Sequence, residues 1–253
     1  MSTSLLDSVQ AVARAAGDVA MSHFRTSLTV DSKGDGSPVT AADREAEQVA
    51  RTMIAARFPA DGILGEEFGD TPGTSGRRWY LDPIDGTLSF IHGVPLWGTL
   101  VAVAEGERVL AGAAYFPAVG EIITAAPGAG CWWNGRRAQV SDTSTLAGAT
   151  VLITDERTFR RQSQREGWRT LTGEASVART WGDCFGYLLV ATGRAEVMVD
   201  PVMNPWDAAG FQPIIEEAGG SFTDLSGKRT AFGGSVVATN AALRKIVRDY
   251  FDD

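Results

Sequence analysis

The stretch from Trp79 to Phe90, WYLDPIDGTLSF, restricts the fold more than any other part of the chain. Its apolar start is typical of a buried strand, yet the strand ends in Asp82, and a second carboxylate, Asp85, follows three residues later. Because Pro83 fixes the backbone directly after the first acid, both carboxylates can lie on one side of a tight turn, with the Ile84 carbonyl between them. Two charges at the mouth of a buried strand indicate a site.

Other acids lie at the predicted starts and ends of elements elsewhere in the chain: Asp43, Glu66, Glu67 and Asp207. Taken alone, each has an ordinary interpretation as a partner of a helix N-terminus or as part of a solvated turn. If they converge on Asp82 and Asp85, they cannot all stay ionised, because like charges raise each other's pKa. Carboxylates without histidine or cysteine favour Mg²⁺ as the balancing cation, and two such ions about 3.5 to 4 Å apart can bind a phosphoryl group.

The first half of the chain is predicted to contain two helices followed by a sheet. Apolar residues at three- and four-residue intervals predict an amphipathic helix over 4–25, and a second helix begins at Thr40, which forms a capping-box pattern with Asp43. The segment 31–40 between them is interpreted as a glycine-rich loop. An antiparallel sheet is then predicted from strands at 62–67, 77–82, 96–106, 108–117, 121–126 and 130–140, the last with a hairpin turn at Asn134 and Gly135.

The second half alternates between strands and helices. Strands are predicted at 149–154, 176–181, 195–200 and 235–240, and helices at 158–171, 183–192 and 206–218, with a last helix that Asn240 can cap. This pattern predicts a C-terminal α/β lobe over 139–253 that follows an N-terminal α+β lobe over 1–138. No repeat or linker separates them, so we expect the two lobes to share a buried interface.

Composition excludes several classes of protein. A chain of 253 residues that is 44% apolar can form a full core, and its formal net charge of −8 argues against nucleic-acid or anionic-membrane partners, which need clustered lysine and arginine. Two cysteines are too few for a disulfide framework, which favours a reducing compartment. No leader pattern or run of about 18 apolar residues occurs, so we expect a cytoplasmic protein.

The motifs, taken together, resemble those of the inositol monophosphatase superfamily of metal-dependent, lithium-sensitive phosphatases. The pattern of that family is an Asp, then Glu-Glu, then Asp-Pro-Ile-Asp-Gly-Thr, then Trp-Asp, which is followed after eleven residues by Gly-Gly. The chain shows the same motifs in the same order over nearly its whole length, at Asp43, Gly65–Glu67, Asp82–Thr87, Trp206–Asp207 and Gly219–Gly220. The resemblance implies an α/β fold arranged as a five-layer α/β/α/β/α sandwich.

The resemblance also implies two to three Mg²⁺ ions and assigns their ligands. Glu66, Asp82 and the Ile84 carbonyl should hold one ion. Asp82, Asp85 and Asp207 should hold a second, and Glu66 should reach a third, weaker ion through water. The implied reaction is direct in-line attack of a metal-activated water on a phosphate monoester.

Further roles follow from the same resemblance. Thr87, paired with Asp43, should orient the attacking water, and the amides of Gly86 and Thr87 should hold the phosphate at a helix start. Glu67 corresponds to a second, site-supporting glutamate, and Lys33 corresponds to a loop lysine near the metal site. A homodimer is implied as well, and Trp132 and Trp133 are candidates for its interface or for core packing.

The segment RTWGDCFGYLLVATG, which begins at Arg179, bears on the substrate. Inositol-specific members carry a small hydroxyl residue where this chain has Asp183, and the version seen here resembles the histidinol-phosphatase branch. L-histidinol phosphate carries an ammonium and an imidazole, which carboxylates bind, whereas inositol offers only hydroxyls. Asp200 and Asp207 are further candidate substrate contacts. Alternatively, Asp183 caps a helix after Gly182, and Arg179 is a surface or dimer-contact residue.

Three alternatives stay open at this stage. Within the same fold, the chain can be an inositol-1-phosphatase or a broader sugar-phosphate phosphatase. It can also be a metal-binding regulatory relative without activity, although the complete ligand set argues against this. Finally, Cys131 to Arg137 matches the Cys-x5-Arg spacing of cysteine-dependent phosphatases, but two tryptophans and Asn-Gly between them predict a hairpin.

Overall fold

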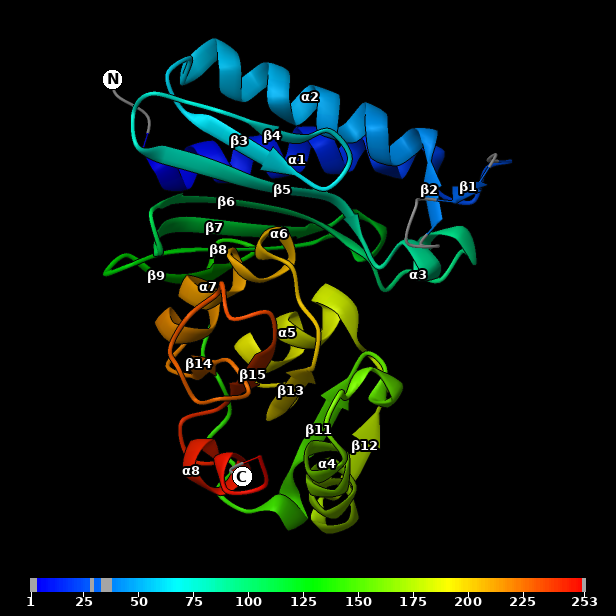
Figure 1. Cartoon of the computed structure of the whole chain (residues 1–253), viewed down its shortest axis with the longest axis vertical. Helices are drawn as coiled ribbons and strands as arrows, with labels where there is room; N and C mark the ends of the chain where they lie inside the picture. Colours follow the sequence, from blue (N-terminus) through cyan, green and yellow to red (C-terminus); the bar gives the residue numbers. More distant parts are fainter. Residues whose placement is uncertain (1–3, 28–29, 33–37, 252–253) are drawn as a thin grey trace.

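The structure is a computed structural model that describes residues 4–27, 30–32 and 38–251. Its elements stack in five layers: a pair of long helices, an eight-stranded sheet, a middle layer of helices, a five-stranded sheet and outer helices (Figure 1). This arrangement confirms the predicted α/β/α/β/α sandwich. Among the described residues, no helix combines the length and the apolar character needed to cross a membrane.

The outer layer consists of α1 (Leu5–His23) and α2 (Ala41–Arg57). Both begin at capping boxes, in which the side chains of Ser4 and Thr40 accept helix N–H groups, as the sequence predicts for α2. The glycine-rich loop predicted between them is only partly a loop, because β1 (Val30–Ser32) pairs with β2 (Pro38–Thr40). Lys33 lies outside the described residues.

The eight-stranded sheet has the order β10-β9-β8-β7-β6-β5-β3-β4. Its strands are β3 (Gly62–Gly65), β4 (Gly69–Thr71), β5 (Arg77–Asp85), β6 (Gly98–Glu105), β7 (Arg108–Phe116), β8 (Glu121–Ala126), β9 (Gly130–Trp133) and β10 (Arg136–Arg137). The prediction of a purely antiparallel sheet was wrong in one place, since β3 and β5 run parallel, and the short β4 was missed. The hairpin turn at Asn134 and Gly135 is confirmed by positive φ angles at both residues.

The five-stranded sheet has the order β12-β11-β13-β15-β14. Its strands are β11 (Thr150–Ile153), β12 (Val177–Arg179), β13 (Val197–Asp200), β14 (Ser221–Thr223) and β15 (Val236–Thr239). Strand β11 is parallel to both β12 and β13, whereas β15 is antiparallel to both of its neighbours. The four predicted strands are present, and β14 is an additional edge strand that the sequence analysis missed.

The remaining helices are α3 (Thr87–Ile91), α4 (Gln162–Glu174), α5 (Asp183–Ala191), α6 (Pro205–Ala208), α7 (Phe211–Glu217) and α8 (Arg244–Arg248). Two predictions were wrong in their bounds. The helix predicted at 158–171 is α4, which begins later, after a short 3-10 turn. The helix predicted at 206–218 is broken into α6 and α7, because Pro213 has no N–H to donate within a continuous helix. Asn240 caps the turn before α8 by accepting the Leu243 N–H at 2.9 Å.

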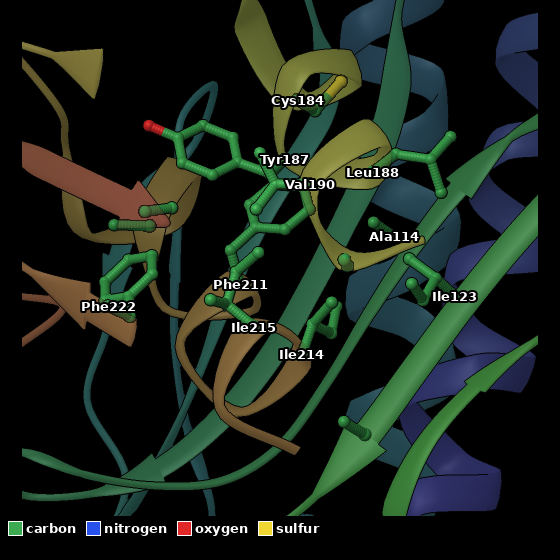
Figure 2. Close-up of a cluster of buried hydrophobic side chains, with 14 of the residues drawn as sticks. Ala114, Ile123, Cys184, Tyr187, Leu188, Val190, Phe211, Ile214, Ile215 and Phe222 are labelled. Atoms are coloured by element: carbon green, nitrogen blue, oxygen red, sulfur yellow. The ribbon is translucent and has the colours of Figure 1, made fainter. Parts of the chain in front are cut away.

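The middle layer joins the two sheets through one buried core. Figure 2 shows side chains of α5 and α7 packed between residues of the first sheet, such as Ile123, and Phe222 of the second sheet. The rings of Tyr187 and Phe211 stack at 4.8 Å between centroids. The boundary expected between residues 138 and 139 lies in the connection between the sheets, and the core on both sides of it is continuous.

Candidate active site

The parallel pairing of β3 and β5 brings their carboxyl ends to the same edge of the sheet. Gly65 lies opposite Leu81, and the next residue, Glu66, donates its N–H to the Leu81 carbonyl at 3.1 Å. Asp82 and Asp85 continue β5 beyond this point. Three of the predicted metal ligands therefore lie at one sheet edge because two neighbouring strands run in the same direction.

The turn after Asp82 is built as its sequence predicts. Oδ1 of Asp82 accepts the N–H of Ile84 at 3.0 Å, and the register of β5 against β6 shifts between Asp82 and Asp85. The hydroxyl of Thr99 on β6 donates to the Pro83 carbonyl at 2.7 Å. These bonds hold the backbone of the bulge, which leaves the Asp85 carboxyl at the sheet edge beside Asp82.

Gly86 is one of the residues at which the two halves of the chain are in close contact. Its φ of 89° is a left-handed conformation that favours glycine, and it caps the short helix α3. A Cβ there would lie 2.9 Å from the Leu96 carbonyl oxygen and 3.3 Å from Oδ2 of Asp183. The Asp183 carboxylate therefore lies beside the glycine of the DPIDGT motif, although nearly one hundred residues separate them.

The C-terminal half supplies Asp183, Asp200 and Asp207. Asp207 is in the first turn of α6, where its Oδ2 accepts the backbone N–H of Asn204 at 2.9 Å. Asp200 ends β13 and is almost fully buried, and its oxygens accept the Tyr187 hydroxyl at 2.8 Å and the Thr154 N–H at 3.3 Å. Figure 2 shows the Tyr187 hydroxyl pointing out of the apolar cluster.

The geometry at Asp183 differs from that of a helix cap. Asp183 is the first residue of α5, with a left-handed φ of 47°, and the N-cap position before it is occupied by Gly182, which has no side chain. Its own N–H donates to Oγ1 of Thr154 at 2.7 Å. A Cβ at Gly182 would lie 2.3 Å from the Thr154 Cα, so the chain passes very close to β11 here. Burial is the one cause of the raised pKa of the Asp183 carboxyl, with no opposing hydrogen bond from the helix start, so this carboxyl does not cap α5.

Burial is the main cause of the raised pKa values in this cluster. It raises the pKa of Asp82 well above its ordinary value, and the charges of Glu66, Asp85 and Asp207 raise it further. Burial also raises the pKa of Asp207 to about 6, although the N–H of Asn204 works in the opposite direction. These carboxyls share one site in which they cannot all be ionised without a cation.

Asp85 is where the acids of the two halves interact. Burial raises its pKa well above the ordinary value, and Asp183, Asp207 and Asp200 add to the increase, in that order. Burial alone raises the pKa of Asp183 to about 6, and it raises the pKa of Asp200 to about 7 against the hydrogen bonds from Thr154 and Tyr187. The site therefore extends from the β3–β5 edge into the C-terminal half.

The donor set matches the chemistry of a hard divalent cation, since it consists of carboxylates and backbone carbonyl oxygens. Within residues 4–27, 30–32 and 38–251, however, no three acids, histidines or cysteines are already spaced to enclose an ion. The acids are neighbours that a cation would draw together, and they do not form a closed cage by themselves.

The predicted pair of Thr87 and Asp43 is not formed by the bonds seen here. The single hydroxyl proton of Thr87 is donated to the Ile84 carbonyl at 3.0 Å. Oδ2 of Asp43 accepts the N–H and hydroxyl of its own N-cap, Thr40, at 2.8 and 2.7 Å. Asp43 is nevertheless close enough to Glu66 for that charge to contribute, after burial, to its raised pKa.

Two other candidates are placed differently. Arg179 is exposed at the end of β12, and its guanidinium donates to the Ala178 carbonyl at 2.7 Å, so the structure does not bring it to the acids. Glu67 follows Glu66 in the turn after β3, and its N–H donates to Oε2 of Glu47 at 2.8 Å.

The sequence analysis missed Glu47, Thr154 and Tyr187, which contact site residues. Glu47 is four residues after Asp43 on α2, so helical spacing would have placed it on the same face. Thr154 follows β11 directly, where a polar residue after an apolar strand is a usable signal. Tyr187 carries no signal of its own, because an aromatic residue in an apolar helix is typical of core packing.

The environment of Cys131 argues against a cysteine nucleophile. It lies fully buried on β9, and burial raises the pKa of its thiol to about 12. Arg137 donates to the Ala129 carbonyl at 3.0 Å and stacks on Trp132. The segment forms a hairpin, as predicted, and offers no loop around a phosphate.

Open hollows elsewhere on the surface do not include the acids. One of about 840 Å³ lies beside α8 and β14, and another of about 890 Å³ lies beside the 201–204 segment. Neither is lined by any of the candidate site acids. The chemistry of the donor set, not the size of a hollow, identifies the site.

The chain is similar to known proteins in both sequence and structure. A sequence model of the inositol monophosphatase family matches residues 2–250. The histidinol-phosphatase of Chlorobaculum parvum is 44% identical over 239 residues, which cover 93% of this chain and 92% of that protein. The histidinol-phosphatase of Streptomyces coelicolor is 34% identical over 257 residues, covering 95% and 94%. A solved inositol monophosphatase from Zymomonas mobilis has a TM-score of 0.85 at 30% identity, covering 97% and 96%.

Proposed function

We propose, from the premise that the chain belongs to the inositol monophosphatase family and is a phosphoric monoester hydrolase, that its substrate is L-histidinol phosphate. The products are L-histidinol and phosphate, and the role is a step of histidine biosynthesis. The observation that carries this proposal is the carboxylate of Asp183, which lies beside Gly86 and whose pKa is raised by burial with no opposing hydrogen bond from its helix.

The acids at the β3–β5 edge are proposed to bind Mg²⁺, two to three ions per site. Glu66, Asp82, Asp85 and Asp207, with the Ile84 carbonyl, have the oxygen chemistry for it. The raised pKa values of Asp82, Asp85 and Asp207 indicate a site that lacks positive charge. Bound Mg²⁺ would neutralise these acids, polarise the phosphate oxygens and make a water molecule a better nucleophile.

The chain's own groups are proposed to position the reactants. The amides of Gly86 and Thr87 lie at the start of α3, next to Asp85, and would hold phosphate oxygens. Thr87 would turn its hydroxyl from the Ile84 carbonyl towards the attacking water, with Asp43 as its partner, and Glu67 would support the turn that carries Glu66. The reaction would proceed by in-line attack without a phosphoenzyme.

Specificity is proposed to come from negative charge opposite the phosphate site. Asp183 would bind the ammonium or the protonated imidazole of histidinol, because charge-assisted hydrogen bonds to cations are strong. Asp200 lies deeper and would add negative charge below Asp183, while Thr154 holds both acids in place. Arg179, which is exposed, is proposed to act only at the rim.

The decisive test is phosphate release from histidinol phosphate and from inositol-1-phosphate, with Mg²⁺ and with EDTA. Asp183→Asn is expected to lower kcat/KM for histidinol phosphate by about 100-fold and to change the rate with inositol-1-phosphate far less. Asp142→Asn, an exposed acid of the same half, is the matched control and should change neither rate. Equal losses on both substrates would remove Asp183 from substrate recognition.

An inositol-1-phosphatase, or a broader sugar-phosphate phosphatase, is the second candidate. It is favoured by the likeness to the Zymomonas mobilis inositol monophosphatase over nearly the whole chain. A higher kcat/KM for inositol-1-phosphate than for histidinol phosphate would establish it. A protein that binds Mg²⁺ but hydrolyses neither ester would instead be a regulatory relative.

A cytoplasmic homodimer is proposed as the working form. Both cysteines are free and buried, which suits a reducing compartment. Each tryptophan donates its indole N–H within the chain, Trp132 to the Ala129 carbonyl at 3.0 Å and Trp133 to Glu121 at 2.7 Å. Trp132 is the more exposed of the two, so it is the better candidate for an interface. Light scattering on a size-exclusion column should give twice the chain mass of 26.9 kDa.

A further inference from the structure

Glu47 is a buried carboxylate that the proposed mechanism does not use. It lies on α2, one turn after Asp43, and its side chain is fully buried. Oε2 accepts the N–H of Glu67 at 2.8 Å, and Oε1 accepts the N–H of Phe68 at 3.2 Å. Both oxygens therefore hold the backbone of the turn that carries Glu66.

The contact between α2 and this turn is too close for any side chain at Gly65. A Cβ there would lie 2.1 Å from Oε1 and 2.4 Å from Cδ of Glu47. The glycine of the Gly-Glu-Glu sequence is thus needed because the Glu47 carboxylate occupies the space beside the backbone.

Arg51, a further turn along α2, completes the arrangement. Its Nε donates to Oε1 of Glu47 at 2.7 Å, and its other nitrogens donate to Oγ1 of Thr71 at 2.9 Å and to the Gly69 carbonyl. The guanidinium neutralises Glu47 and ties it to the β3–β4 hairpin on the far side of the turn. Residues 66–68 are therefore held from α2 through one carboxylate.

We infer that Glu47 is a positioning residue for the divalent-cation site, because it fixes the turn from which Glu66 reaches Asp82. The inference rests on the proposed function, since it requires that Glu66 and Asp82 share an ion. A carboxylate is needed at this position because both oxygens accept backbone N–H groups. Glutamine would present an NH₂ group to one of those N–H donors and would displace the turn.

The test is calorimetric titration of Mg²⁺ into the metal-free protein for wild type, Glu47→Gln and Glu45→Gln. Glu45 is on the same helix with an exposed side chain paired to His23, so it is the matched control. Glu47→Gln is expected to weaken Mg²⁺ binding by about 10- to 100-fold, as found for groups that orient metal ligands, and Glu45→Gln should leave it unchanged. Activity of Glu47→Gln should return to within a few-fold of wild type at saturating Mg²⁺.

The outcomes separate this inference from the proposed function. Wild-type Mg²⁺ affinity in a folded Glu47→Gln protein would overturn the positioning role and leave the phosphatase proposal intact. A wild-type protein that binds no Mg²⁺ would overturn both. If Glu47→Gln does not fold by circular dichroism, Glu47→Asp keeps the charge but withdraws it from the two amides, and wild-type affinity in that variant would equally overturn the inference.

Discussion

Buried carboxylates near the two ends of strand β5 have opposite shifts of their pKa values. Near its start, Asp61 accepts hydrogen bonds from Arg77 at 3.0 Å, from Ser75 at 2.6 Å and from the Trp79 indole at 3.0 Å. Burial pushes the pKa of Asp61 upward, but these bonds outweigh it and hold the pKa below its ordinary value.

Near the other end of β5, Asp82 is also buried, and burial with three neighbouring acids raises its pKa well above the ordinary value. Among the described residues, no lysine, arginine or histidine forms an ion pair with Asp82, Asp85 or Asp207. Asp61, which has a structural role, is thus accompanied by a fixed cation, Arg77. Asp82, Asp85 and Asp207 have no such partner among the described residues, which supports the proposal that they bind a cation from solution.

The largest expected effect on activity is at the Asp82 end of β5. Asp82→Asn should lower kcat by on the order of 1,000-fold, because loss of a metal ligand forfeits several kcal/mol of transition-state stabilisation. The metal-free variant should melt no lower than wild type, since one like charge has been removed. Steady-state kinetics and a thermal melt in EDTA check both parts. A melt that drops with the activity would make Asp82 a structural acid like Asp61.

Asp61→Asn should lower stability and leave activity almost unchanged, which is the reverse of the result expected for Asp82→Asn. It leaves Arg77 without its carboxylate partner, which is expected to lower the free energy of unfolding by about 3 kcal/mol. The folded variant should keep kcat within a few-fold of wild type. Urea denaturation measures the first effect, and a large loss of kcat in protein shown to be folded would contradict the division between the two ends.

The acids of the site and Asp61 are expected to make the free energy of unfolding depend on pH in opposite directions. Raised folded-state pKa values at Asp183, Asp200 and Asp207 mean that the folded protein binds more protons than the unfolded chain between about pH 4 and 7. The free energy of unfolding without metal should therefore fall by several kcal/mol as pH rises through that window, because each unit by which a pKa is raised corresponds to about 1.4 kcal/mol. Asp61 contributes stability that is lost as pH falls below about 4. Melts in EDTA from pH 4 to 8 test this, and a rise across the window would contradict it.

The smallest change in activity is expected for Cys131, a buried residue that lies at neither end of β5. Cys131→Ser should leave kcat within about two-fold of wild type, because the thiol is neutral and lies in a hairpin away from the acids. Phosphate release with histidinol phosphate measures this. A loss similar to that of Asp82→Asn would restore the cysteine-dependent alternative.

Local patterns predicted much of this molecule. The capping box of α2, the apolar spacing of α1 and the Asp82 turn depend on residues close in sequence, so they were visible without the fold. The break between α6 and α7 also has a local cause, Pro213, but its effect on the helix was overlooked because it lies in an apolar run.

Features that depend on distant contacts were not predictable in the same way. The parallel pairing of β3 with β5 is set by the sheet and not by either strand. The role of Glu47 depends on a close approach to Gly65, and that of Thr154 on the passage of Gly182 beside β11. The acids themselves could be named from motifs, whereas the side chains that hold them required coordinates.

Cation binding by the acids of the site is tested most directly by titration of Mg²⁺ into the metal-free wild-type protein at pH 6.5, in two buffers of different ionisation enthalpy. We expect saturable binding with net release of protons, because the carboxyls of Asp82, Asp85 and Asp207, whose pKa values are raised, must lose protons to bind the ion. Binding should disappear in Asp82→Asn and persist in Asp61→Asn. Absence of saturable binding to the wild-type protein would contradict the claim that these acids depend on a cation from solution.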